Sequence, residues 1–189
     1  MIEVEIRGRL TEEKFSELKQ FFTEKGGHIE SHTREMIRLY DYPGFAEDSN
    51  KREVDIRVRD TDGKCEIMVK RKAAENNVAR HELSLKLADG SMEAAKEVLK
   101  ALGYAKGLWM HRKKDVFKYE GVEWSLVEAP SKIFYFEAEM EASDAESIPA
   151  TEKQLRAKAQ ELGLEVLGPE AYLKLIAELG EKTNKVITW

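Results

Sequence analysis

Charged residues recur at every second position in several segments of this chain, with apolar residues between them. Glu3 and Glu5 open the pattern, and Glu137 and Glu139 repeat it in the last third of the sequence. Side chains two positions apart share one face of a strand and lie roughly 7 Å apart. If the two strands approach each other, four carboxylates converge and form an oxygen-ligand site for Mg²⁺ or Mn²⁺. These four glutamates are therefore the predicted metal ligands.

Basic residues supply the complement in three further segments, again at alternate positions. The pairs are Arg57 and Arg59, Lys70 and Lys72, and Arg112 and Lys114. Guanidinium and ammonium groups beside a metal site match a phosphate chain, because they neutralise its oxygens. One or two phosphates would not need six cations, whereas a triphosphate carrying about four charges and a metal ion would. The pattern predicts a triphosphate site.

A plainer interpretation exists for each pair alone. Two like charges on one strand face more often indicate a solvated surface with cross-strand ion pairs. The triphosphate hypothesis depends on the conjunction of at least five strands whose opposite faces are apolar. Those apolar faces are formed by Val54, Ile56, Val58, Ile67, Val69, Leu83, Leu85, Leu87, Phe134, Phe136, Ala138 and Met140.

The order of elements predicts the fold that must position these side chains. Alternation and turn signals predict strands at about 2–9, 28–41, 53–60, 64–72, 77–88, 106–119, 122–128 and 133–142. Helical periodicity predicts helices at about 12–25, from Ser91, at 149–162 and at 169–180. We expect an α+β fold in which an eight-stranded antiparallel β-barrel has helices packed outside. Residues 1–145 would form the barrel and 146–189 a C-terminal helical annex.

Composition narrows the class of protein. The chain has 189 residues and a net charge of −5, so a nucleic acid polymer is not an expected partner. A single cysteine, Cys65, excludes an internal disulfide, and no apolar run reaches the ~18 residues of a membrane span. The chain starts directly in a strand without a signal peptide, so we expect a cytoplasmic protein. The C-terminal helices could serve as a lid, a cover or the surface of a homodimer.

The ordered set of motifs resembles the CYTH superfamily, the triphosphate tunnel metalloenzymes, over about residues 2–142. The matching motifs are Glu3-x-Glu5-x-Arg7, Arg57-x-Arg59, Lys70, Arg80-x-Glu82, Arg112-x-Lys114 and Glu137-x-Glu139. This family includes class IV adenylyl cyclases, thiamine triphosphatases and inorganic triphosphatases. The resemblance implies an eight-stranded tunnel that binds a triphosphate together with a divalent metal.

Three positions depart from the family pattern. Arg7 stands where the family usually has lysine, and an arginine cannot act as a general base although it can stabilise charge. Ser84 stands where a second glutamate often follows Glu82, and Val127 stands near an expected aspartate. The cyclase branch often carries a His-Phe pair ahead of the first motif, which is absent here.

The leading hypothesis is a triphosphatase that depends on Mg²⁺ or Mn²⁺. Glu5, Glu82 and Arg7 are the predicted catalytic residues, with a water on the metal or on Glu82 attacking the terminal phosphorus. The predicted phosphate-binding residues are Arg7, Arg57, Arg59, Lys70, Lys72, Arg80, Arg112 and Lys114. Two alternatives stay open at this point: an adenylyl cyclase with the same lining, and a protein that binds nucleotide or polyphosphate without turnover.

Overall fold

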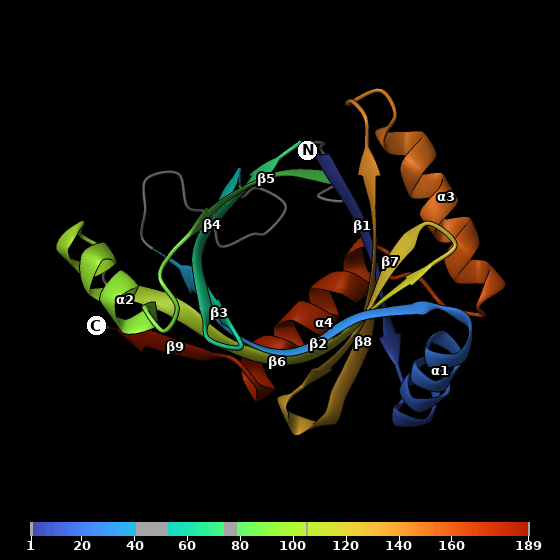
Figure 1. Ribbon diagram of the computed structural model, residues 1–189, viewed down its shortest axis with the longest axis horizontal. Helices are drawn as coiled ribbons and strands as arrows, with labels where there is room; N and C mark the ends of the chain where they lie inside the picture. Colours follow the sequence, from blue (N-terminus) through green and yellow to red (C-terminus); the bar gives the residue numbers. More distant parts are fainter. Residues whose placement is uncertain (1, 41–52, 74–78, 105, 189) are drawn as a thin grey trace.

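Eight antiparallel strands form a closed ring in the computed structural model, which describes residues 2–40, 53–73, 79–104 and 106–188 (Figure 1). The strands follow the order β2-β3-β4-β5-β1-β8-β7-β6, and the ring closes because β6 also pairs with β2. The predicted arrangement of eight antiparallel strands with helices is therefore confirmed. None of the described helices is long and apolar enough to cross a membrane.

The observed elements agree with the predicted ones to within a few residues, apart from two short additions. The strands of the ring are β1 (Ile2–Leu10), β2 (Gly27–Leu39), β3 (Val54–Thr61), β4 (Lys64–Lys72), β5 (Ala79–Lys86), β6 (Lys106–Tyr119), β7 (Val122–Ala129) and β8 (Ile133–Ala142). The helices are α1 (Glu12–Lys25), α2 (Met92–Ala101), α3 (Ile148–Glu161) and α4 (Pro169–Lys182). The additions are the 3-10 turn η1 (Pro130–Lys132) and the strand β9 (Lys185–Thr188).

The alternation in β1 decides which side chains face the centre of the ring. Val4 and Ile6 are fully or almost fully buried on the outer face, in the core that α1 and α3 cover. Helix α1 begins after Thr11, whose hydroxyl accepts a hydrogen bond from the backbone N–H of Lys14 at 3.1 Å. Its Phe22 is completely buried in the same core. Burial of the apolar side chains outside the ring therefore turns the charged side chains of β1 inward.

Helix α4 departs from the expectation that all helices pack outside the ring. It lies within the outline of the ring in Figure 1, and Leu175 and Leu179 line the central cavity. Val127 faces inward from β7 and packs with these two leucines, together with Tyr135 of β8. An apolar residue at position 127 is thus explained by the apolar helix that covers it. Of the roles predicted for the C-terminal helices, α4 covers the cavity, while a homodimer surface and a boundary after residue 145 stay predictions.

The outer face of β5 is exposed, contrary to the expectation that helices cover every apolar face. Leu83 and Leu85 have exposed fractions of 60% and 63%. Helix α2 packs on the neighbouring strands β3 and β4, where Val58 and Cys65 join its buried side chains in one core cluster. Because α2 covers those two strands, these leucines of β5 keep an open face.

The C-terminal residues, for which the sequence suggested no location, form the additional strand β9. Lys185 pairs with Trp109, and Thr188 pairs with Lys106, so β9 runs antiparallel to the start of β6. This pairing attaches the end of α4 to the wall of the ring.

Candidate active site

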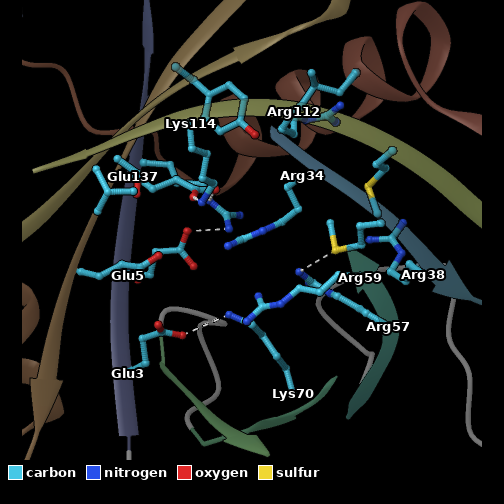
Figure 2. Close-up of a pocket in the computed structure, with 18 of the residues that line it drawn as sticks. Glu3, Glu5, Arg34, Arg38, Arg57, Arg59, Lys70, Arg112, Lys114 and Glu137 are labelled. Atoms are coloured by element: carbon cyan, nitrogen blue, oxygen red, sulfur yellow. Dashed lines mark hydrogen bonds and ion pairs between the residues drawn. The ribbon is translucent and has the colours of Figure 1, made fainter. Parts of the chain in front are cut away.

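A cavity of about 270 Å³ occupies the inside of the ring, and most of the predicted site residues line it. Figure 2 shows Glu3, Glu5 and Glu137 on one wall, with Arg57, Arg59 and Lys70 opposite them. The predicted residues in the lining are Glu3, Glu5, Arg7, Arg57, Arg59, Lys70, Glu82, Arg112, Lys114, Glu137 and Glu139.

The register between β1 and β8 brings three of the four predicted metal ligands together. Glu5 lies directly opposite Glu139, and Arg7 lies opposite Glu137. One carboxylate oxygen each from Glu5, Glu137 and Glu139 falls within 4.8 Å of the others. Glu3 lines the same cavity, but its carboxylate accepts a hydrogen bond from the Lys70 ammonium at 3.1 Å. The three-residue group is therefore the carboxylate cluster of the site.

The proton affinities within the carboxylate cluster are strongly unequal. Burial, together with the charges of Glu5 and Glu3, raises the pKa of Glu139 well above its ordinary value. Burial also raises the pKa of Glu5, although Arg7 opposes this shift. Burial acts the same way on Glu137, but the charges of Lys114 and Arg7 outweigh it and lower the pKa of that carboxyl. Carboxylates that repel one another in a buried site, with oxygen ligands only, fit a hard divalent cation.

Arg7 connects the carboxylate cluster to helix α4. Its guanidinium contacts Glu5 Oε1 at 2.5 Å through Nη2 and donates to Glu137 Oε1 at 3.1 Å through Nε. Its Nη1 donates to the hydroxyl of Tyr172 at 2.8 Å. All three guanidinium nitrogens thus contact an oxygen atom, two through hydrogen bonds and one through an ion pair, which a lysine ammonium at one point could not do. The arginine at this position orients two carboxylates and supports the helix above them.

The cations of β3 and β4 form the opposite wall and are held by acids. Arg57 contacts Asp55 at 2.6 Å, and the charge and hydrogen bond of Asp55 outweigh burial and raise the pKa of Arg57. Lys70 contacts Glu82 at 2.9 Å as well as Glu3. The two carboxylate oxygens of Glu82 therefore face Lys70 and, at 3.6 Å, Arg59.

Ser84, the second departure from the family pattern, takes part in this wall through a hydroxyl. Its Oγ donates to Glu66, and the same carboxylate accepts a hydrogen bond from Arg59. Burial raises the pKa of Glu66, but the hydrogen bonds from Arg59 and Ser84 outweigh it and the net shift is downward. Glu66 thus supplies an acid beside Arg59, next to the position that the serine occupies.

Lys114 and Arg112 extend from β6 into the cavity. The Lys114 ammonium donates to Glu137, within the carboxylate cluster. Arg112 points toward the C-terminal segment and donates to the side-chain oxygen of Asn184 at 2.8 Å. Lys72 and Arg80, two further predicted phosphate-binding residues, are not among the described residues that line the cavity. They lie opposite each other across β4 and β5. Each is two residues along its strand from Lys70 or Glu82, so it is the next residue on the same face.

Sequence reasoning missed several residues of the lining. Arg34 and Arg38 of β2 face the cavity, and Figure 2 shows both on the basic side. Their spacing of four positions in a predicted strand, with Met36 between them, was a signal of the kind used elsewhere in the chain. Glu123 lies opposite Glu139 across β7 and β8 and also lines the cavity. Tyr172 comes from a helix, where strand alternation gives no signal.

The model of the CYTH domain matches residues 1–168. The chain belongs to the CYTH family. This finding confirms the resemblance drawn from the motifs and extends it beyond β8 to the segment that precedes α4. None of the curated proteins compared with the chain matches it.

Solved structures with similar folds come from several different organisms. The PH1819 protein of Pyrococcus horikoshii shares 23% identity at a TM-score of 0.75, covering 93% of this chain and 98% of that one. A candidate adenylate cyclase from Vibrio parahaemolyticus shares 15% identity at a TM-score of 0.71, covering 94% and 98%. A candidate adenylyl cyclase from Hippeastrum, described as having a dominant triphosphatase activity, shares 16% identity at a TM-score of 0.59, covering 93% and 95%. At these identities the likeness establishes the fold.

Proposed function

We propose that this CYTH protein hydrolyses a triphosphate inside the ring in a reaction that depends on a divalent metal. The observation that carries the proposal is the carboxylate cluster, whose oxygens lie within 4.8 Å of one another in a cavity whose opposite wall carries Arg57, Arg59 and Lys70 (Figure 2). Inorganic tripolyphosphate, thiamine triphosphate and nucleoside triphosphates are the candidate substrates. The dominant triphosphatase activity described for the Hippeastrum relative favours the triphosphatase hypothesis over the cyclase hypothesis.

Glu5, Glu137 and Glu139 are the residues that would hold Mg²⁺ or Mn²⁺. When bound there, the ion supplies a Lewis acid for phosphate oxygens and lowers the pKa of a coordinated water. Arg7 and Lys114 fix the carboxylate of Glu137 from two sides. They hold this carboxylate ionised, because their charges lower the pKa of Glu137.

The opposite wall binds and orients the phosphate chain. Arg57, Arg59 and Lys70 face the carboxylate cluster across the cavity, so phosphate oxygens between the walls would meet cations on one side (Figure 2). In the hydrolysis, a water oxygen bonds to the terminal phosphorus, and the bond from this phosphorus to the bridging oxygen breaks. The cations offset the negative charge that develops on the departing diphosphate. Glu82 orients Lys70 and Arg59 through its two oxygens.

Adenylyl cyclase activity is the second candidate function. It would use the same walls, but the ribose 3′-hydroxyl would attack the α-phosphorus and pyrophosphate would leave. An apolar part of the cavity, formed by Leu175, Ile176 and Leu179 of α4, could contact an organic group attached to the phosphates. The description of the Vibrio parahaemolyticus relative also favours this alternative.

The deciding experiment incubates the protein with tripolyphosphate, thiamine triphosphate and ATP, each with Mg²⁺ or Mn²⁺, and separates the products by ion-exchange chromatography. Orthophosphate release that is lost in Glu139→Gln supports the triphosphatase. The matched control is Glu141→Gln, because Glu141 is exposed and is not among the described residues of the cavity lining.

Two other outcomes would replace the proposal. Cyclic AMP together with pyrophosphate would identify a cyclase. Tight binding of a triphosphate without any product would leave the protein as a binding protein and end both enzyme hypotheses for these substrates.

A further inference from the structure

Most cations of the cavity are neutralised by a neighbouring carboxylate, and Arg112 is an exception. Arg7, Arg57, Arg59, Lys70 and Lys114 all form ion pairs with glutamate or aspartate. Arg112 is 6% exposed, yet in the part of the chain that the structure describes it contacts neutral oxygens only. Burial of a cation without a counter-ion is costly, so such a group calls for a specific explanation.

The acceptors around Arg112 come mainly from the C-terminal segment. Nη2 donates to Asn184 Oδ1 at 2.8 Å, and Nη1 donates to Thr183 Oγ1 at 3.4 Å and to the carbonyl oxygen of His111 at 2.6 Å. The Thr183 hydroxyl itself donates to the carbonyl oxygen of Leu179 at 2.8 Å. Both side chains follow directly on the end of α4, where unpaired carbonyl groups carry a partial negative charge that favours a cation.

Asn184 is fixed in this position from both sides. Its backbone N–H donates to the carbonyl oxygen of Leu179 at 2.9 Å, which closes the last turn of α4. The next residue, Lys185, begins β9 and pairs with Trp109, three positions before Arg112 on β6. The helix and the strand together therefore determine where the amide oxygen of Asn184 lies relative to the guanidinium of Arg112.

The side-chain amide of Asn184 is neutral, so its effect on the charge of Arg112 differs from that of a carboxylate. It can orient the guanidinium by a hydrogen bond while leaving its positive charge available to an anion. Arg34, which lies opposite Arg112 across β2 and β6, also donates to a neutral group, the hydroxyl of Thr61 at 3.1 Å. Two neighbouring arginines of β2 and β6 thus donate to neutral groups, and one of them, Arg112, lies at the end of α4.

We propose that Asn184 is a positioning residue that holds Arg112 toward the cavity, charged and un-neutralised, for a phosphate oxygen of the substrate. The proposal rests on the proposed function, because it assumes a polyphosphate ligand. It gives the C-terminal segment after α4 a part in substrate binding, beyond the closure of the cavity.

The test compares Asn184→Asp with Asn184→Ala. Aspartate keeps an acceptor oxygen and adds an ion pair with Arg112, so the variant should unfold at the same temperature as wild type or higher. Its dissociation constant for tripolyphosphate should nevertheless rise at least tenfold, because the new carboxylate neutralises Arg112. Alanine leaves the charge but not its orientation, so we expect a lower melting temperature and a smaller rise of about threefold. Gln160→Glu on the exposed face of α3 adds the same charge far from the cavity and serves as the control.

The readouts are calorimetric binding of tripolyphosphate to the protein in EDTA and the melting temperature of each variant. If Asn184 had a merely structural role, the affinity for tripolyphosphate would follow stability. The proposal would then be overturned, because Asn184→Asp would bind tripolyphosphate as tightly as wild type and Gln160→Glu do. Wild type that binds neither tripolyphosphate nor orthophosphate would overturn it together with the proposed function. Binding that is weakened by Asn184→Asp, without hydrolysis by wild type, would support this proposal and remove only the enzymatic function.

Discussion

Glu5 and Glu139 lie directly opposite each other across β1 and β8, and burial raises the pKa of both carboxyl groups. A divalent cation that binds them competes with the protonation of Glu139, whose pKa is raised. We therefore expect Mn²⁺ binding to release protons and to strengthen as the pH rises toward the raised pKa of Glu139. Calorimetric titration with Mn²⁺ in buffers of different ionisation enthalpy measures the protons released. Affinity that is constant between about pH 5 and pH 8 would contradict the assignment of these ligands.

Glu137 and Glu139, the two glutamates of β8 in the carboxylate cluster, should respond in opposite ways to neutralisation. Glu137 is held by Arg7 and Lys114, and removing one partner of a buried ion pair typically costs about 3–5 kcal/mol. We expect Glu137→Gln to lower the free energy of unfolding by about this amount. Glu139→Gln should leave it unchanged or raise it, because glutamine resembles the protonated acid. Urea unfolding in EDTA checks both, and equal destabilisation by the two variants would contradict the charge distribution described for the cluster.

The raised pKa of Glu139 also predicts that the stability difference between Glu139→Gln and wild type depends on pH. A carboxyl group whose pKa is raised by folding stabilises the fold while protonated, and this contribution is lost as the pH rises through the folded pKa. Glu139 is such a group, and its ordinary value is 4.5. The stability advantage of Glu139→Gln over wild type should therefore grow as the pH rises above 4.5. Unfolding curves without metal at several pH values measure it, and an advantage that shrinks with rising pH would show the opposite sign.

Arg34 should contribute to triphosphate binding although no motif marks it. Hydrogen bonds to charged groups contribute about 1.5–3 kcal/mol, which corresponds to a loss of roughly 10- to 100-fold in affinity when Arg34 is replaced by methionine. Lys113→Met is the matched control, because the side chain of Lys113 is 62% exposed on the outer face of β6. The dissociation constant for tripolyphosphate distinguishes them, and equal values for the two variants would exclude Arg34 from the binding surface.

Gly8 is required in β1 by the close approach of the chain that precedes α4. A Cβ atom at this position would lie 2.2 Å from the carbonyl oxygen of Glu165 and 2.1 Å from the ring of Phe136. Overpacking of this kind costs about 1–3 kcal/mol, so Gly8→Ala should lower the free energy of unfolding by at least that much. Gly180 lies on the exposed face of α4, and nothing lies within 4 Å of a Cβ added there. Gly180→Ala should therefore raise the free energy of unfolding by about 0.5–1 kcal/mol. Denaturant unfolding of both variants measures the difference, and an unchanged Gly8→Ala would contradict the described packing.

The sequence by itself determined the strands of the ring and the inward direction of their charges. Alternation has a period of two in every strand, so residues such as Glu5 and Glu137 could be assigned to one face without knowledge of the partners. The order of the motifs also predicted the family. Arg34 and Arg38 share one face by the same period, but Met36 interrupts the run of charges and neither residue belongs to a family motif.

Only the tertiary structure decided which of these side chains meet. The register between β1 and β8 brings three carboxylates together, whereas Glu3 pairs with Lys70 instead. Such a register depends on pairing between segments that are far apart in the sequence. The position of α4 inside the ring could not be inferred from its own periodicity, because an amphipathic helix packs equally well against an inner or an outer apolar surface. Tyr172 and Asn184 reach the cavity because α4 packs on β7 and β8 and because β9 attaches the end of that helix to β6.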